Sequence, residues 1–207
     1  MNSVRYFDSI KGLQSSDLST YTQLQINIIA KIDDKQTQTL SEALARCTNL
    51  NTLSLSLYNN NVFEAGVQGL GNALKIFTSI KSLTLILFSN QIGPLGSSDL
   101  GLGLASCVNL TSLTINLRWN QIGSLGAMNL VANLSNCPTL QILKLDLSWN
   151  QITNYGSKCF GSSLINCSTI NFFIFDIRDN QVNRVFHQQL RTNFNKMKRL
   201  VKKVLKL

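Results

Sequence analysis

Apolar and polar positions repeat every thirty residues along most of this chain. In residues 110–139, three apolar residues first alternate with polar ones, which is the spacing of a strand with one buried face: Leu113, Ile115 and Leu117. Leu130 and Leu134 then follow four residues apart, which is the spacing of a buried helix face. Each copy therefore predicts one short strand, a turn and one helix.

The most regular position of the repeat is an asparagine that follows the predicted strand: Asn60, Asn90, Asn120, Asn150 and Asn180. Its side-chain amide has donors and an acceptor for backbone groups of the turn, which no neighbouring strand can reach. We interpret this asparagine as structural. Strands that are thirty residues apart with a helix between them must run parallel, so the pattern predicts an α/β solenoid.

The run L-x-L-x-L-x-x-N-Q-I, followed by a glycine and by leucines four apart, resembles the leucine-rich repeat. A true helix in each copy resembles the ribonuclease-inhibitor-like class of that family. The resemblance covers about residues 22–207 and implies a right-handed α/β horseshoe arc, with a concave parallel sheet and helices on the convex side. Arrays this rich in Asn and Gln also resemble leucine-rich repeat proteins of ciliates.

The phase of the repeat divides one domain into three segments. Residues 1–21 form an N-terminal capping segment, in which we expect a helix with Phe7, Ile10 and Leu13 facing inward. Residues 22–199 form about six leucine-rich repeats, and residues 200–207 form a terminal edge strand, the seventh, with a basic C-terminal end. At the helix starts, Ser124 and Asn154 occupy the expected N-cap positions.

Composition favours a folded protein, since 44% of the 207 residues are hydrophobic and only 14% are charged. The first twenty residues lack the apolar stretch of a signal peptide, and no apolar run is long enough to span a membrane. Five cysteines, an odd number, favour a reduced protein. We therefore expect an intracellular, most simply cytoplasmic, location, with ciliary and nuclear locations left open.

Candidate chemical groups are few. Four cysteines share one phase of the repeat with Phe77, which predicts a buried apolar position and not a metal site: Cys47, Cys107, Cys137 and Cys167. Cys159 lies in a polar phase and is expected to be an exposed thiol, and the single histidine, His187, lies on a predicted convex helix. We predict no catalytic, metal or cofactor site and a non-enzymatic protein.

Positions predicted to face outward from the concave sheet vary between copies, whereas the structural positions hardly vary. Aromatic and arginine side chains are favoured anchors at protein interfaces. The candidate partner-binding residues are Tyr58, Phe88, Arg118, Trp119, Asp146, Trp149, Asp176 and Arg178. For the two tryptophans the alternative is that they shield the turn beside the asparagine.

The C-terminal end is strongly basic, because residues 191–207 hold seven basic side chains and no acid. The candidates for electrostatic contacts are Lys196, Lys198, Arg199, Lys202, Lys203 and Lys206. They could belong to an amphipathic helix that docks on a membrane or a partner. They could instead lie on a terminal strand, where lysines prevent edge-to-edge pairing. Nucleic acid binding is disfavoured, because no aromatic side chains are interleaved for stacking.

These patterns predict a protein-protein interaction scaffold or assembly subunit that holds a protein partner on its concave face and needs no cofactor. The alternative is an electrostatic adaptor whose basic end binds an acidic surface: nucleic acid, an acidic protein such as tubulin, or an anionic membrane. The two differ in the salt dependence of binding, which is steep for an adaptor.

Overall fold

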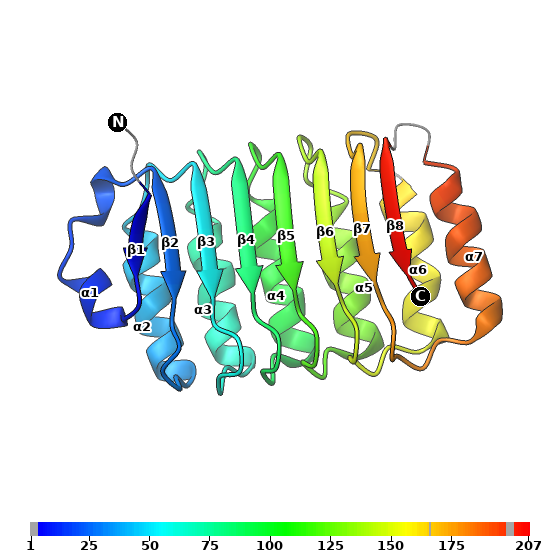
Figure 1. Cartoon of the computed structure of the whole chain (residues 1–207), viewed down its shortest axis with the longest axis horizontal. Coiled ribbons are helices and arrows are strands. Elements are labelled where there is room, and N and C mark those ends of the chain that lie inside the picture. Colours follow the sequence, from blue (N-terminus) through cyan, green and yellow to red (C-terminus); the bar gives the residue numbers. More distant parts are fainter. Residues whose placement is uncertain (1–3, 166, 198–200) are drawn as a thin grey trace.

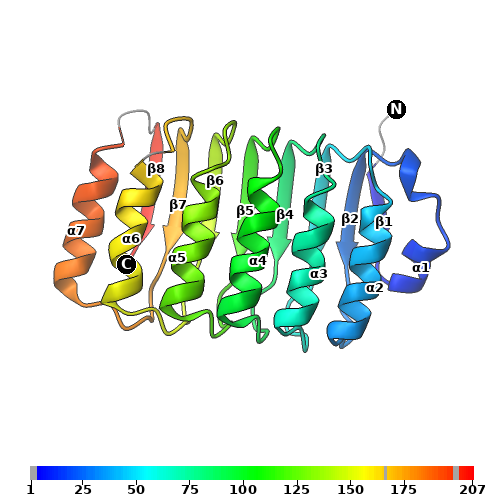
Figure 2. The same cartoon turned by 180° about the vertical axis from the view of Figure 1, so that it is seen from behind.

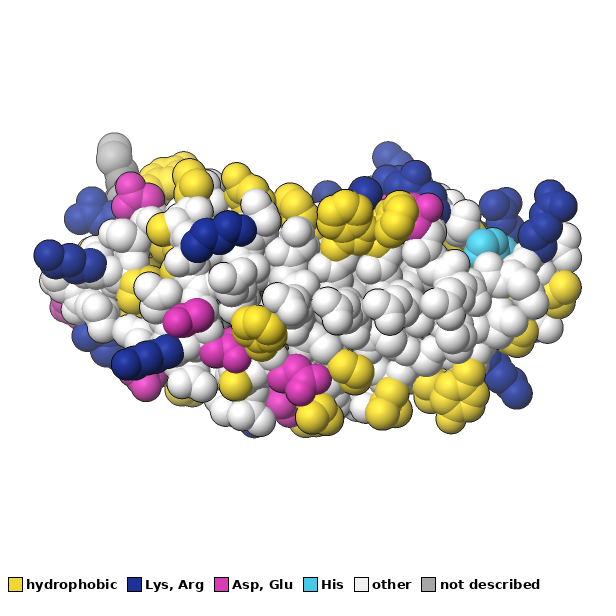
Figure 3. All heavy atoms as spheres, turned by 90° about the horizontal axis from the view of Figure 1, so that it is seen from below, with side chains coloured by type: hydrophobic (Ala, Val, Ile, Leu, Met, Phe, Trp, Pro, Cys, Tyr) yellow, Lys and Arg dark blue, Asp and Glu magenta, His cyan; other side chains and the backbone are white. Residues whose placement is uncertain are grey.

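A computed structural model describes residues 4–165, 167–197 and 201–207. Eight strands form one parallel sheet in the order of the chain, and the helices cover one of its faces (Figures 1 and 2). Viewed from below, the molecule is a shallow arc whose helix side bulges outward (Figure 3). The predicted α/β solenoid is confirmed.

The strands are β1 (Arg5–Phe7), β2 (Gln23–Asn27), β3 (Thr52–Ser56), β4 (Ser82–Ile86), β5 (Ser112–Asn116), β6 (Ile142–Asp146), β7 (Phe172–Asp176) and β8 (Lys202–Lys206). The helices are α1 (Ile10–Gln14), α2 (Asp34–Ala45), α3 (Glu64–Leu74), α4 (Gly93–Ala105), α5 (Gly123–Leu134), α6 (Asn154–Ile165) and α7 (Arg184–Asn195). A short 3₁₀ helix spans Leu18–Thr20.

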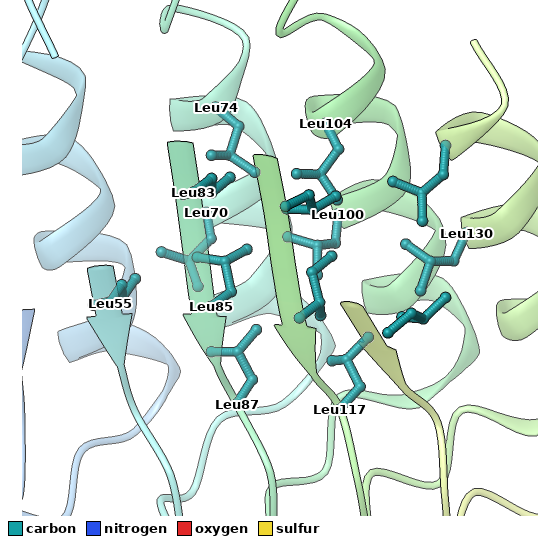
Figure 4. Packing of buried hydrophobic residues seen from close by; sticks show 14 of the residues in the cluster. Leu55, Leu70, Leu74, Leu83, Leu85, Leu87, Leu100, Leu104, Leu117 and Leu130 are labelled. Atoms are coloured by element: carbon teal, nitrogen blue, oxygen red, sulfur yellow. The ribbon is translucent and has the colours of Figure 1, made fainter. Parts of the chain in front are cut away.

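Strand register follows the thirty-residue repeat, since Leu113 pairs with Leu83 on one side and with Leu143 on the other. Between β2 and β3 the register is one residue shorter, because Leu24 pairs with Leu53. Alternate residues of strands β2 to β7 point into one continuous core, where leucines of the strands meet leucines of the helices (Figure 4). No copy can bury its apolar residues alone, so each depends on its neighbours.

The buried asparagines connect each repeat to the preceding one. The Nδ2 atom of Asn120 donates to the carbonyl oxygens of Leu87 (2.9 Å), Leu117 (3.0 Å) and Arg118 (3.1 Å), while its Oδ1 accepts from the backbone N–H of Ile92 (3.4 Å). Asn90, Asn150 and Asn180 make the same kind of bonds in their own repeats. The structural interpretation of this position therefore fits the geometry.

A second series of hydrogen bonds joins the helix starts and corrects the N-cap prediction. Helix α5 begins at Gly123, so Ser124 is not its N-cap; the Ser124 hydroxyl instead accepts from the N–H of Thr153 in the next repeat (3.0 Å). Asn154 likewise accepts from Asn183 (2.9 Å). Neighbouring helices start at the same height in the array. A side chain in the first turn of one helix therefore reaches the unpaired backbone N–H groups at the start of the next helix.

The N-terminal segment differs from the expected single helix. Residues Arg5–Phe7 form β1, which pairs with β2, and among the described residues of this segment only the five of α1 are α-helical. Leu13 is buried and Ile10 packs against the core, both as expected, but Phe7 reaches it from a strand. The sheet thus has eight strands, because pairing with β1 satisfies backbone groups that β2 would otherwise leave open.

Glycines stand where neighbouring helices approach most closely. A Cβ atom on Gly126 would lie 2.8 Å from the Cα of Pro94, and one on Gly156 would lie 2.8 Å from the Cα of Ser124. Helix α7 carries Phe186 at this position of the repeat. Because a phenylalanine cannot approach so closely, a hollow of about 610 Å³, lined in part by Phe186, opens between α6 and α7.

The four in-phase cysteines are buried, as predicted, and their thiols lie near helix ends. The thiol of Cys107 donates to the carbonyl of Leu74 in the preceding repeat (3.4 Å). Burial raises the pKa of Cys107 and of Cys137 to about 12, and the neighbouring cysteine adds to each shift. Cys159 is half-buried on α6, and thus less open than the sequence suggests.

Replacing Asn120 by alanine should lower the free energy of unfolding by about 3 kcal/mol, because several buried backbone groups lose their partners. Asn60→Ala is a matched control at the N-terminal end, where the amide donates over longer distances of 3.4 and 3.3 Å, and should cost less. Urea unfolding followed by circular dichroism measures both. Equal losses would contradict this account of the asparagine.

Thiol labelling should separate the cysteines. A raised pKa keeps a thiol protonated and unreactive, so a maleimide should modify Cys159 first in the native protein. Mass spectrometry should find one label per native chain and five after unfolding in urea. Early labelling of Cys107 or Cys137 would show that the helix ends open far more readily than their burial implies.

Candidate functional site

The predicted partner-binding residues gather where the strands end, on the sheet side of the molecule. Parallel hydrogen bonding continues past the strands, from the N–H of Ser89 to the carbonyl of Arg118 (2.8 Å) and from the N–H of Trp119 to that of Ser148 (3.2 Å). Corresponding residues of neighbouring copies are therefore held side by side. We call this set the aromatic rim: Tyr58, Phe88, Arg118, Trp119 and Trp149.

Side chains of the aromatic rim pack against one another. The rings of Tyr58 and Phe88 stack with centroids 5.2 Å apart and 14° between their planes. Trp119 and Trp149 meet edge to face, with centroids 5.5 Å apart. The guanidinium carbon of Arg118 lies 5.6 Å from the centre of the Trp119 ring, which is cation-π range. These contacts arrange four aromatic rings and one cation along four adjacent copies.

Both tryptophans occupy a left-handed backbone conformation, each with φ of 57°. The same position carries Asn59, Ser89 and Asp179, with φ between 55° and 58°. Asn and Asp tolerate this conformation well, whereas it is unusual for bulky side chains. Trp119 is 49% exposed and Trp149 is 44% exposed, so the core does not require them either.

A hollow of about 570 Å³ lies between these side chains. Its lining comes from four copies: Tyr58, Asn59, Phe88, Ser89, Asn116, Arg118, Trp119 and Asp146. Asn116 accepts from the N–H of Arg118 (3.1 Å), and Asp146 accepts from the N–H of Ser148 (3.0 Å). Asn116 is not among the partner-binding residues predicted from the sequence. The same position of the next two copies carries Asp146 and Asp176, so a side-chain oxygen recurs there in three consecutive copies. Figure 3 shows a large hydrophobic patch over the ends of β5 and β6, with basic and acidic side chains beside it.

Asp176 does not lie on the open surface, which corrects its assignment to the partner-binding face. It is 4% exposed, and Arg178 covers it with two hydrogen bonds, Nε to Oδ1 (3.0 Å) and Nη2 to Oδ2 (2.8 Å). Burial alone would raise the pKa of Asp176, but the hydrogen bonds and charge of Arg178, with Lys206 at 3.7 Å, lower it below the usual value. Asp176 therefore positions the exposed Arg178.

Lysines of the basic end are partly engaged within the molecule. Lys202 lies on β8, over the ring of Phe172 at 5.6 Å, and Lys203 donates to Asn195. Lys206 pairs with Asp176, and Lys196 is exposed. Lys198 and Arg199 lie outside the described residues. The contacts of Lys202, Lys203 and Lys206 leave less of the basic charge open to a ligand than the sequence suggests.

Chemistry elsewhere in the described part of the chain is limited. There, no three His, Cys, Asp or Glu side chains are grouped as metal ligands would require. Burial, and then the charge of Arg191, lowers the pKa of His187, which lies on α7, whereas Cys159 lies on α6. Within the same residues, no helix combines the length and apolar character that crossing a lipid bilayer requires.

Comparison with known proteins agrees with this geometry. The family model described as Leucine Rich repeat matches residues 107–131 and 136–161, which are two adjacent copies. No curated protein sequence matches the chain. The crystal structure of an internalin from Listeria monocytogenes is 18% identical over 100% of this chain and 69% of that chain, with a TM-score of 0.40. The two matched copies are thus leucine-rich repeats, and the other copies of the array continue the same parallel sheet beside them.

Proposed function

We propose that this protein is a non-enzymatic scaffold that holds a protein partner against its aromatic rim, as a subunit of a larger assembly. Leucine-rich repeat folds generally serve as protein-interaction scaffolds, and solenoids bind along their extended concave surfaces. The aromatic rim lies at the border of that surface, where the strands end.

The observation that carries this proposal is the pair of tryptophans. Trp119 and Trp149 stand in a backbone conformation that disfavours bulky side chains, and about half of each side chain is open to solvent. Neither local conformation nor core packing gives a reason for an indole there, and other copies place small polar residues at this position. Tryptophan and arginine are the side chains that most often dominate binding energy at protein interfaces.

The surroundings of the aromatic rim define the kind of surface it would fit. Arg118 lies beside Trp119, and Arg178 is fixed by the buried Asp176. The half-buried Asp146 lines the hollow below them. A partner that inserts an apolar side chain into the hollow and offers an acidic group to Arg118 or Arg178 would match both features.

Replacing both tryptophans by asparagine should abolish partner binding and preserve the fold. Asn59 already occupies this position with φ of 55°, so the exchange suits the backbone and the melting temperature should change by no more than a few degrees. Each tryptophan that acts as a central anchor contributes about 2 kcal/mol or more, so affinity should fall by over about a hundredfold. Affinity capture with the wild-type and variant chains, followed by titration of the captured partner, measures this loss.

Lys202→Glu with Lys203→Glu is the comparison variant, since it reverses charge at the C-terminal end without touching the aromatic rim. It should change the association rate more than the affinity. If this variant lost the partner while the tryptophan variant kept it, and if binding fell steeply with salt, the electrostatic adaptor would replace the present proposal.

A further inference from the structure

A row of exposed apolar side chains runs along the helix side of the same edge. One residue near the start of each of four consecutive helices forms it: Leu95, Leu125, Tyr155 and Val185, exposed by 64%, 57%, 70% and 59%. They are thirty residues apart, so they occupy one position of the repeat. Figure 3 shows hydrophobic side chains following one another along this border, over α4 to α7. We call the four residues the apolar ridge.

The fold does not require apolar residues at this position. Two earlier copies carry Lys35 and Ala65 there, both exposed, and their helices form as well as the others. Single exposed apolar residues are ordinary on protein surfaces, but a contiguous row of them marks an interaction site. The apolar ridge is therefore a surface in its own right, separate from the aromatic rim on the sheet side.

Charge changes sign along the apolar ridge. The position just before it carries Asp34 and Glu64 at the N-terminal end of the array and Arg184 at the C-terminal end. The three copies between them carry Pro94, Ser124 and Asn154, which are uncharged. The carboxylates are held in place, because Asp34 accepts from the N–H of Phe63 (2.7 Å) and Glu64 accepts from that of Leu95 (3.2 Å).

We propose that the apolar ridge binds a second copy of this chain, related by a two-fold axis so that the two arrays run antiparallel. In this arrangement Glu64 of each copy faces Arg184 of the other, and the uncharged copies between them are the part that is buried. The axis then lies near Leu125, because Glu64 and Arg184 each lie two copies away from it. Such an isologous contact is the commonest kind in homo-oligomers.

Two physical arguments favour a second copy over an unrelated protein. Neighbouring helices lie about 10 Å apart, and a second copy has the same spacing, so successive ridge side chains of the two copies stay in step along the contact. The charge gradient is also self-complementary only when the arrays are antiparallel. A parallel pair would place Glu64 against Glu64 and Arg184 against Arg184.

Sedimentation equilibrium of the whole chain tests the contact. The wild-type chain should form a dimer at micromolar concentrations, and Leu125→Glu should raise the dissociation constant by about a hundredfold, since it places a charge at the buried centre. Leu102→Glu is the matched control. Leu102 is another exposed leucine (48%), which lies on α4 and away from the ridge. The control should dimerise as the wild type does.

Charge exchange tests the antiparallel orientation. Glu64→Lys and Arg184→Glu should each weaken the homodimer, whereas an equimolar mixture of the two variants, or one chain carrying both changes, should regain it. Because Glu64→Lys also loses the hydrogen bond to Leu95, its melting temperature is followed by circular dichroism. The double variant lacks the same hydrogen bond, so its recovery would come from the restored charge pairs.

Several results would overturn the proposal. These are a wild-type chain that stays monomeric at about 100 μM, a Leu125→Glu variant that still dimerises, or charge exchange without recovery. Binding of the monomer to neutral phosphatidylcholine vesicles, lost in Leu125→Glu, would assign the ridge to a lipid surface instead. The variant with both tryptophans replaced by asparagine should still dimerise, so failure of this inference is distinguishable from failure of the proposed function.

Discussion

The turn that follows each strand sets the main physical constraint on this protein. Its backbone N–H and C=O groups are buried, and neither the sheet nor the helix can pair them all. In five copies one asparagine pairs them, and Asn120 reaches from its own strand end to Leu87 and Ile92 of the preceding copy. Because this set of bonds has fixed geometry, successive copies keep one length and one register, and whole columns of side chains align.

Aligned columns explain how a regular array acquires local function. Once core and turn positions are satisfied, every other position is free to vary, and each variable column lies on a known surface. On the sheet side, the edge where the strands end carries aromatic and arginine side chains, and Trp119 and Trp149 stand there in a left-handed backbone conformation. The helix side of the same edge gained an apolar column and a charge gradient from Glu64 to Arg184. Two recognition surfaces can thus coexist on one small solenoid.

Sequence alone predicted what depends on periodicity: the parallel sheet and the buried cysteines both follow from spacing. It did not predict the contacts that individual side chains make. Ser124 has the residue type of an N-cap, yet it bonds to the next repeat, because the helix begins at Gly123. Asp176 belongs to an outward column, yet Arg178 covers it. Periodicity also cannot show which apolar columns stay exposed, so the apolar ridge required the structure.

The central claim is that a partner contacts the aromatic rim, and the chain offers a direct probe of it. Its only two tryptophans, Trp119 and Trp149, both lie there. A chain labelled with 5-fluorotryptophan gives one fluorine NMR signal for each indole. On addition of saturating partner, both signals should shift and broaden, as expected for rings that become buried. Two signals that stay unchanged while the partner is bound would contradict the account.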